Sequence, residues 1–301
     1  MSNKLLIAIV GPTAVGKTAI AIDIALKLKT EILSADSRQF YREMEIGTAK
    51  PSAQELNKVP HHFINNLSIH DEYNAGKYEK EALACLSTLF KNHDKVVLAG
   101  GSGLFINALC NGFDELPDAD LQLRETYEKI LRDKGITVIQ QELAEKDKAY
   151  YDIVDRNNPR RLIRALEVIH QTGLPYSQFR KKKVATRDFS VLKIGLQLEK
   201  EELIQRIDKR IDDMLAAGWL DECKNLYSYK ELNALKTVGY TELFDFIAGK
   251  NDWSTTVQNI KTNTWHYAKR QITWFKKDKE IKWFSPNTNG LIADIRNLIE
   301  M

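Results

Sequence analysis

The sequence predicts an α/β fold in which a parallel sheet is flanked by helices and interrupted by a helical insertion. Short apolar runs rich in β-branched residues alternate with helical stretches, which is typical of buried parallel strands. A glycine-rich loop joins the first run to the first helix, and residues 121–190 show helical patterns without a comparable strand. Of the 301 residues, 43% are hydrophobic and 28% charged, a globular composition that excludes intrinsic disorder and a collagen-like repeat.

The elements follow in order along the chain. We expect strands at residues 5–10, 31–36, 95–99 and 191–198, and the first helix at residues 18–28. Residues 200–275 are again helical in pattern, with turns near Gly218, Gly239 and Gly249. Because strands precede and follow the helical stretch, we assign residues 1–120 and 191–301 to an α/β core with C-terminal helices. Residues 121–190 form the predicted helical insertion domain.

The loop after the first strand matches the pattern GxxxxGK[ST] and lies between a buried strand and a helix, as a P-loop requires. Its glycines let backbone N–H groups converge on phosphate oxygens, its lysine neutralises charge, and its last hydroxyl suits Mg²⁺. The sequence therefore predicts a P-loop NTPase-like sheet that binds phosphate or diphosphate. The loop comprises Gly11, Pro12, Thr13, Ala14, Val15, Gly16, Lys17 and Thr18.

The acid that accompanies a P-loop in most NTPases is missing from the expected place. Such enzymes carry a Mg²⁺-binding acid at the end of an apolar strand, but the strand at residues 95–99 is followed by Gly100, Gly101 and Ser102. Asp36 ends another predicted strand and precedes a polar and aromatic segment. Asp36 is placed to remove a proton from an attacking group near the phosphate site. The alternative is a helix cap or a Mg²⁺ ligand.

The net charge of +3 hides two basic segments. Residues 156–190 carry +7 and residues 261–282 carry +5. In the first segment Asn158 is a plausible N-cap, and Arg160 and Arg164 project opposite the apolar face. In the second, Arg270 and Trp274 lie across from the apolar stripe, a mixture that binds phosphates and stacks on unpaired bases. These segments indicate either a polyanionic partner such as a nucleic acid or a solvated basic surface, and the charge alone leaves both interpretations open.

A third helix, expected at residues 202–214, carries Arg206 and Arg210 four residues apart beside its apolar stripe. Either arginine can form a surface ion pair or reach the phosphate site, and the sequence leaves both interpretations open.

The cysteines and the N-terminus predict the compartment. Cys85, Cys110 and Cys223 form no metal-ligand pattern, so we propose no zinc site and expect a reducing compartment. The apolar run at residues 5–10 is too short for a signal peptide or a membrane span. We expect a soluble cytoplasmic protein.

With these motifs in place, the chain closely resembles the bacterial tRNA dimethylallyltransferases (tRNA isopentenyltransferases), of the IPP transferase family, which prenylate N6 of adenine 37 beside the anticodon. The resemblance spans nearly the whole chain. Ser102 stands where many members have Thr, and Phe40 where an aliphatic residue is common. The blocks that carry the resemblance are residues 11–18, 35–41, 46–51, 60–62, 100–104, 158–168, 238–240 and 268–275.

The resemblance implies a reaction. The P-loop would hold the diphosphate of dimethylallyl diphosphate, with Thr18 and Mg²⁺, and Asp36 would act as general base on adenine N6. Arg210 would stabilise the leaving diphosphate. The acceptor would be a tRNA anticodon stem-loop with its adenine flipped out of the loop, and the enzyme a monomer.

The same matching implies the residues that face the tRNA. The basic segment at residues 180–187 matches no family motif, so its role rests on charge alone. The implied residues are Asp36, Ser37, Arg38, Gln39, Ser102, Arg124, Arg160, Arg161, Leu162, Ile163, Arg164, Lys236, Thr237, Val238, Gly239, Tyr240, Thr241, Lys269, Arg270, Gln271, Ile272, Thr273, Trp274, Phe275 and Lys276.

Three alternatives stay open. An adenylate isopentenyltransferase would share the P-loop and Asp36, but would have less use for a basic insertion. A P-loop kinase is disfavoured by the missing strand-end acid. A non-catalytic RNA-binding protein that has kept a phosphate loop would bind without turnover.

Overall fold

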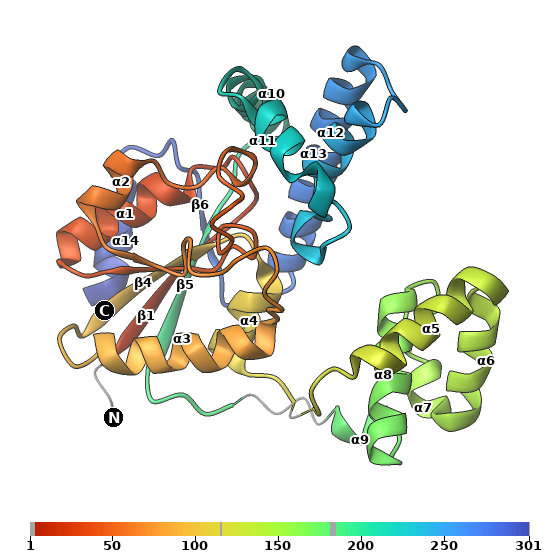
Figure 1. Ribbon diagram of the computed structural model, residues 1–301. Helices are drawn as coiled ribbons and strands as arrows, with labels where there is room; N and C mark the ends of the chain where they lie inside the picture. The colour runs from red at the N-terminus through yellow and green to blue at the C-terminus, as the bar shows by residue number, and fades with distance from the viewer. Residues whose placement is uncertain (1–3, 115, 181–184, 301) are drawn as a thin grey trace. The chain divides into compact units, whose positions relative to one another are not determined.

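The computed structural model of the protein describes residues 4–114, 116–180 and 185–300 (Figure 1). Two compact units are present: an α/β unit, made of Met1–Asn111 and Thr186–Met301, and a helical unit, Gly112–Ala185. The basic run at residues 181–183 lies outside the described residues. Among the residues that the structure describes, no helix is both long and apolar enough to cross a membrane.

The α/β unit is built on a six-stranded parallel sheet with strand order β3-β2-β4-β1-β5-β6. The parallel sheet predicted from the sequence is confirmed. Two short edge strands, β3 and β6, were not predicted, because neither the two histidines of β3 nor the Lys-Trp-Phe of β6 forms an apolar, β-branched run. The strands are β1 (Leu5–Val10), β2 (Ile32–Ser34), β3 (His61–His62), β4 (Lys95–Gly100), β5 (Ser190–Leu196) and β6 (Lys282–Phe284).

Helices cover both faces of the sheet (Figure 1). On β1, Ile7 and Ile9 point to the face covered by α1 and α14, while Leu6 and Ala8 point to the face covered by α3 and α4. This alternation follows from the two-residue period of a strand, and both faces are apolar because both are buried. These helices are α1 (Lys17–Leu28), α2 (Ala53–Lys58), α3 (Ala75–Leu89), α4 (Gly103–Asn111) and α14 (Leu291–Glu300).

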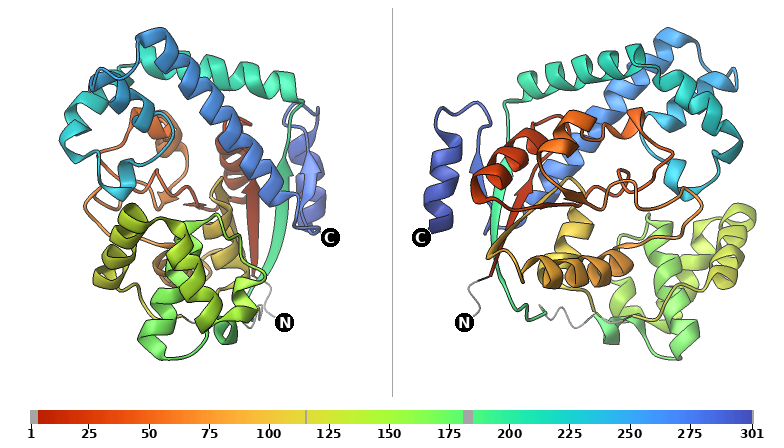
Figure 2. Two further views of the ribbon diagram at one scale, coloured as in Figure 1. Left: turned by 90° about the vertical axis from the view of Figure 1, so that its right-hand side faces the viewer. Right: turned by 60° about the vertical axis from the view of Figure 1, so that its left-hand side comes forward.

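The C-terminal helices form a third apolar cluster together with the loop that follows β2. Leu203 and Ile207 of α10, Tyr240 of α12 and Ala268 of α13 are fully or almost fully buried in it. The long helix α13 contacts both α10 and α12 (Figure 2). This layer therefore places α10 and α13 near the P-loop. Its elements are α10 (Lys200–Ala216), α11 (Trp219–Leu226), α12 (Tyr240–Ile247), α13 (Trp253–Phe275) and the short 3₁₀ turns η1 (Ile46–Thr48), η2 (Tyr227–Tyr229) and η3 (Asn233–Leu235).

The helical unit has its own core, centred on residues such as Leu143, Leu162 and Leu166. Helix α8 begins as the sequence predicts: the Asn158 side chain accepts the N–H of Arg161, and a proline occupies the first turn. Its helices are α5 (Leu121–Lys134), α6 (Ile136–Lys146), α7 (Lys148–Tyr151), α8 (Pro159–Thr172) and α9 (Tyr176–Phe179).

The helical unit spans Gly112–Ala185, whereas the sequence pattern predicts an insertion at residues 121–190. Arg187 explains the second boundary. Its Nε donates to the carbonyl oxygen of Leu109 at 3.0 Å, and its Nη2 donates to the carbonyl oxygen of Ala108 at 2.8 Å. The same Nη2 lies 2.6 Å from Glu79 Oε1 on α3. Residues 186–189 are thus attached to the end of α4 and belong to the α/β unit.

Candidate active site

The P-loop connects the carboxyl end of β1 to the start of α1. Gly11 has φ +147° and Gly16 has φ +100°, backbone conformations that residues with a side chain rarely adopt. A Cβ at Gly11 would also lie only 2.6 Å from the carbonyl oxygen of Leu196 on β5. Lys17 folds back over the loop and donates to the carbonyl oxygen of Pro12 at 2.7 Å. The glycines at these positions therefore set the loop geometry that a phosphate site needs.

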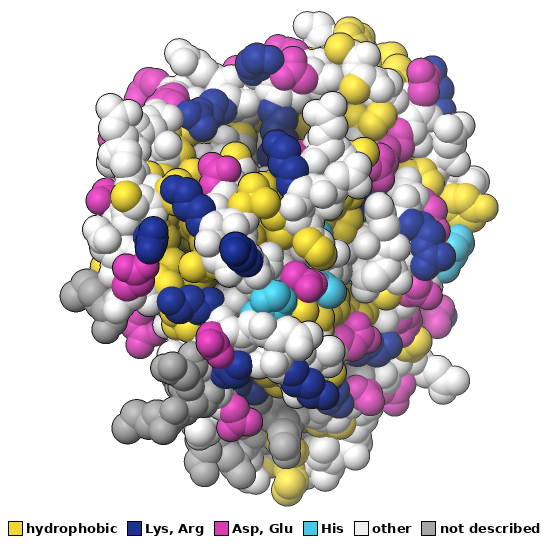
Figure 3. Space-filling view, turned by 90° about the vertical axis from the view of Figure 1, so that its left-hand side faces the viewer, with side chains coloured by type: hydrophobic (Ala, Val, Ile, Leu, Met, Phe, Trp, Pro, Cys, Tyr) yellow, Lys and Arg dark blue, Asp and Glu magenta, His cyan; other side chains and the backbone are white. Residues whose placement is uncertain are grey.

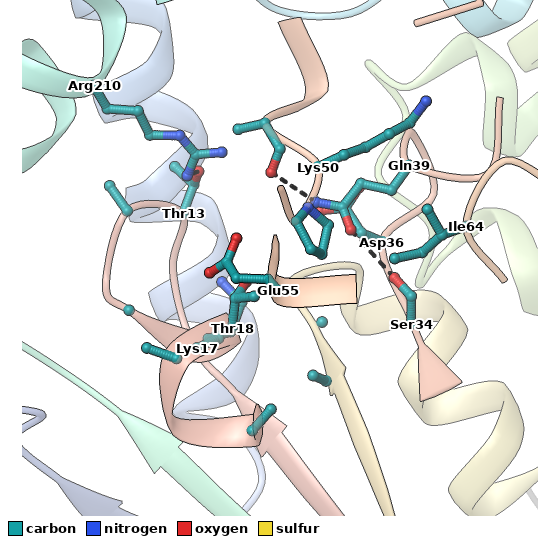
Figure 4. A pocket seen from close by; sticks show the side chains of 18 of the residues that line it. Thr13, Lys17, Thr18, Ser34, Asp36, Gln39, Lys50, Glu55, Ile64 and Arg210 are labelled. Atoms are coloured by element: carbon teal, nitrogen blue, oxygen red, sulfur yellow. Dashed lines mark hydrogen bonds between the residues drawn. The ribbon is translucent and has the colours of Figure 1, made fainter. Parts of the chain in front are cut away.

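A cavity of about 460 Å³ opens beside the P-loop (Figure 4). This volume is in the range of small-molecule sites. Its walls include the P-loop, the segment after β2, the end of β4, α10 and α13. The lining residues that bear on chemistry are Thr13, Lys17, Thr18, Asp36, Gln39, Arg206, Arg210, Tyr267 and Gln271.

Two cations inside this cavity are poorly solvated. Burial lowers the pKa of Lys17 to about 8, against the raising effect of Asp36, and nearby Arg210 lowers it further. Burial likewise lowers the pKa of Arg210, whose Nη1 donates to Thr13 Oγ1 at 3.2 Å. Neither cation forms an ion pair with any carboxylate that the structure describes. A polyanion such as diphosphate would supply the missing negative charge.

Asp36, in the segment after β2, lines the same cavity and interacts electrostatically with both cations. Its Oδ1 accepts the N–H of Arg38 at 3.0 Å, which fixes the carboxylate in a tight turn. Tyr267 of α13 lies on the same cavity, and burial together with the charge of Asp36 raises the pKa of this tyrosine. The carboxylate thus borders the phosphate site and has one oxygen, Oδ2, with no hydrogen bond to any described residue, so it can accept a proton.

Several residues predicted to face tRNA lie near Asp36. The Ser102 hydroxyl accepts the N–H of Ser37 at 2.9 Å, and Arg38 Nη1 donates to the carbonyl oxygens of Asn233 and Ala234 at 3.0 Å. A second, smaller cavity of about 110 Å³ is lined by Asp36, Arg38, Arg210, Thr237 and Val238, among others. The segments at residues 36–38 and 237–238 therefore meet beside the predicted base.

The exposed face of α13 combines positive charge with aromatic surface. Trp274 is 41% exposed, and the Arg270 guanidinium lies 5.8 Å from the centre of the Tyr267 ring. These features suit phosphate contact and base stacking. A shallow depression on this face is lined by His266, Lys269, Arg270, Thr273, Trp274 and Lys277.

The side of the α/β unit on which α1 and α2 lie has a different surface. There, Lys and Arg side chains are interspersed with acidic and apolar ones (Figure 3). Positive charge is not gathered into one patch on this side, in contrast to the exposed face of α13.

Within the helical unit, the predicted arginines fall into two classes. Arg124 and Arg164 each lie 2.8 Å from the fully buried Glu167, one on each carboxylate oxygen. Arg160 and Arg161, at the start of α8, are exposed. Only the second pair presents its charge to solvent without a carboxylate partner among the described residues.

Some of the residues expected to face tRNA are buried, so their side chains do not reach the protein surface. They lie on the inner faces of α8, α12 and α13, because consecutive residues of a helix cannot all point outward. Gly239 precedes α12 and packs directly against Trp219, so closely that an added Cβ would overlap the indole ring. The buried set is Leu162, Ile163, Gly239, Tyr240, Gln271 and Phe275, and Ile272 is partly buried.

Glu222 of α11 also helps to build the site, although no sequence motif indicated it. Its carboxylate accepts the backbone N–H groups of Glu45, Ile46 and Gly47 at 2.7 to 3.1 Å, and the Tyr240 hydroxyl at 2.5 Å. These contacts hold the loop after β2 against the C-terminal helices. The three backbone partners lie 175 to 177 residues before Glu222 in the sequence, so no local pattern could indicate them.

Of the two arginines that the sequence left open, Arg210 reaches the P-loop. Arg206 lines the same cavity, but its Nη2 forms an ion pair with Glu202 at 2.9 Å and donates a hydrogen bond to Asn287 Oδ1 at 2.8 Å. Within residues 4–114, 116–180 and 185–300, no group of three or more His, Cys, Asp or Glu side chains is arranged to hold a metal ion.

Comparison with known proteins gives one consistent result. The chain is 46% identical to the tRNA dimethylallyltransferase of Cytophaga hutchinsonii, covering 99% of this chain and 97% of the relative. It is 48% identical to that of Christiangramia forsetii, covering 96% of each chain. Its fold is similar to the tRNA isopentenylpyrophosphate transferase of Bacillus halodurans (TM-score 0.73, 33% identity, 99% of this chain and 96% of that one).

A eukaryotic dimethylallyltransferase acting on tRNA is also similar (TM-score 0.81, 27% identity, 98% of this chain and 78% of that one). The sequence pattern described as IPP transferase matches residues 39–278. With a matching pattern over most of its length and close relatives over nearly all of it, this chain belongs to the IPP transferase family.

Proposed function

We propose that this protein transfers a dimethylallyl group from dimethylallyl diphosphate to N6 of adenine 37 in tRNA, as its family and relatives lead us to expect. The observation that carries the proposal is the shared cavity: the P-loop with the cations Lys17 and Arg210 lies on one side and Asp36 on the other. Such a site can hold a diphosphate leaving group and deprotonate a nucleophile at the same time.

The diphosphate end is formed by the P-loop, Lys17 and Arg210. As the bond between C1 and the bridging oxygen breaks, negative charge grows on the departing diphosphate and positive charge on the allyl group. Backbone N–H groups, the Lys17 ammonium and the Arg210 guanidinium stabilise that diphosphate. Arg210 is held toward the loop by its hydrogen bond to Thr13.

Asp36 serves the acceptor. The exocyclic amine of adenine is a poor nucleophile, because its lone pair is delocalised into the ring. A carboxylate that accepts a hydrogen bond from this amine, and then its proton, assists attack on C1. The N6–C1 bond forms, the C1–O bond breaks, the proton goes to Asp36, and diphosphate leaves.

The tRNA would bind the exposed basic faces. The α13 face around Arg270 and Trp274 suits an anticodon stem-loop, because its unpaired bases can stack on aromatic rings. Arg160 and Arg161 of the helical unit supply further phosphate contacts. A target adenine must leave the stack to reach Asp36.

Mg²⁺ fits the donors present. This ion usually keeps several waters and binds substrate phosphates with one or two protein oxygens, so the Thr18 hydroxyl beside a diphosphate is a sufficient protein ligand. When bound, the ion would neutralise charge on the diphosphate. We also propose that the enzyme is a cytoplasmic monomer, and size-exclusion chromatography with light scattering can check its oligomeric state.

One experiment distinguishes this function from its competitors. The protein is incubated with Mg²⁺ and radiolabelled dimethylallyl diphosphate, and with unmodified tRNA, the same tRNA carrying guanine at position 37, or AMP. Kinase activity is tested in parallel with labelled ATP and a nucleoside. We expect label only in the unmodified tRNA with adenine 37. Label in AMP but not in tRNA, phosphate transfer from ATP, or tRNA binding without transfer would each contradict the proposal.

A further inference from the structure

Gln271 is a buried amide at the centre of the site. It is 6% exposed and lies on the inner face of α13 with Ala268 and Phe275. Its Oε1 accepts the backbone N–H of Thr13 at 2.8 Å, and its Nε2 donates to the carbonyl oxygen of Gly101 at 2.8 Å. The amide therefore joins the P-loop to the residue after β4.

The connection extends to a third element. The hydroxyl of Thr13 accepts a hydrogen bond from Arg210 Nη1 of α10 at 3.2 Å. Gly101, Gln271, Thr13 and Arg210 thus form one continuous chain of hydrogen bonds across the carboxyl end of the sheet. Both the backbone and the side chain of Thr13 are fixed within it.

The fit around the amide is close. A Cβ at Gly101 would overlap Gln271 Nε2 and would lie 3.6 Å from Lys17 Nζ. Only a neutral group with one acceptor and one donor satisfies Thr13 and Gly101 together. A carboxylate would keep the acceptor, lose the donor, and place negative charge beside the site of an anionic substrate.

We propose that Gln271 is a positioning residue for the diphosphate: it fixes Thr13 in the P-loop and, through Thr13, the guanidinium of Arg210. This inference rests on the proposed function, because it assigns Gln271 a role in holding the leaving group. Gln271 acts through other residues and contacts no tRNA. Residues on the opposite face of the same helix, such as Arg270 and Trp274, carry the tRNA contacts.

The first test uses Gln271→Met, which preserves the length of the side chain and removes both hydrogen bonds. We expect the KM for dimethylallyl diphosphate to rise about tenfold, which corresponds to about 1.4 kcal/mol. The Kd for tRNA should stay within about twofold of the wild-type value. Gln258→Met is the matched control, because Gln258 is exposed on the same helix and should change neither constant.

The second test uses Gln271→Glu and a pH series. When the glutamic acid is protonated, its O–H can donate to Gly101 and its carbonyl oxygen can accept from Thr13, as the amide does. The KM ratio of variant to wild type should therefore fall toward one as the pH is lowered from about 8 to about 6. Other ionisable groups line the same cavity, and dividing by the wild-type KM at each pH removes their contribution. They are Lys17, Asp36, Lys50, Glu55, His61, Arg206, Lys209, Arg210, Asp213 and Tyr267. A loss that came from the shape of the side chain, and not from its two hydrogen bonds, would be the same at every pH.

Two outcomes of the Gln271→Met test would overturn the inference. One is an unchanged KM for dimethylallyl diphosphate in Gln271→Met, and the other is a tRNA Kd that weakens as much as that KM. If Gln271→Met does not fold, as judged by circular dichroism, Thr13→Val and the Gln271→Glu pH series replace it. Thr13→Val should raise the same KM, and a wild-type KM in this variant would also overturn the inference. Failure of the wild-type enzyme to label tRNA would instead refute the proposed function.

Discussion

Arginines are central to both compact units, but their partners differ. In the helical unit, Arg124 and Arg164 bind the two oxygens of the buried Glu167, which also accepts the N–H of Asp120 at 2.6 Å. In the α/β unit, Arg210 and Lys17 line a cavity, and the acceptors of their hydrogen bonds among the described residues are neutral. The first arrangement is complete within the protein and stabilises a fold. The second lacks negative charge and favours an anionic ligand.

The largest effect should come from the carboxylate of Asp36, which faces the cations of the cavity. Asp36→Asn keeps an acceptor for the N–H of Arg38 but removes the base, so we expect kcat to fall about 10²–10⁴-fold. The tRNA Kd should change little. Single-turnover transfer measures the first quantity and filter binding the second. Asp23→Asn, at an exposed position of α1, is the control. A near wild-type rate in Asp36→Asn would remove Asp36 from the role of base.

In the helical unit, the corresponding change should affect stability. Glu167→Gln leaves Arg124 and Arg164 with weaker partners. Because these arginines are 38% and 25% exposed, we expect a loss of about 2–3 kcal/mol in the free energy of unfolding of this unit. Hydrogen exchange of the α5 and α8 amides in the full-length protein measures it. Glu128→Gln, an exposed change on α5, should stay within about 0.5 kcal/mol. Equal protection in both variants would show that the buried ion cluster is not stabilising.

The cavity cations should also give the diphosphate site a pH dependence. Lys17 has a pKa of about 8 and is charged below it, so the Kd for inorganic diphosphate should rise about tenfold per pH unit above about pH 8. Lys17→Arg stays charged over this range and should lack the rise. Calorimetric titration gives the Kd of each protein at each pH. The ionisation of inorganic diphosphate affects both Kd values equally, so it cancels in the ratio of the two. A parallel rise in Lys17→Arg would mean that Lys17 does not titrate.

The smallest effect should come from the exposed arginines. Arg160→Ala combined with Arg161→Ala should weaken tRNA binding about fivefold and lower the slope of log Kd against log salt by about 0.7–0.9 for each phosphate that the variant no longer neutralises. Stability should be unchanged, whereas Arg164→Ala opens the Glu167 cluster. Arg132→Ala, at an exposed site on α5, is the matched control. An unaltered salt slope would show that Arg160 and Arg161 neutralise no tRNA phosphate and are only part of the solvated surface.

Much of the α/β unit could be predicted from local patterns. The strand at Leu5–Val10 was predicted with its observed limits, because a short β-branched run before a P-loop has few other interpretations. The Asn158 cap was equally clear, since a cap is a local interaction. Edge strand β3 escaped prediction, because its two histidines form no apolar run.

The contacts that complete the site were harder to predict. Arg210 and Arg206 are equivalent in sequence, and only the packing of α10 brings Arg210 to Thr13. Gln271 offered a usable signal: it lies three residues after Ala268 and four before Phe275, so a polar group occurs on an apolar helix face. Such a group must find partners inside the protein. Which partners it finds depends on the loops at the ends of β1 and β4, which are far away in sequence.

Arg187 has a consequence for how this chain can be rebuilt. By binding the carbonyl oxygens of Ala108 and Leu109, it keeps the point where the polypeptide leaves the sheet close to the point where it returns. A segment whose two ends are held together can be exchanged without moving the framework that bears it. The residues in between, Gly112–Ala185, can therefore be exchanged as one piece while the α/β framework that carries the cavity stays in place.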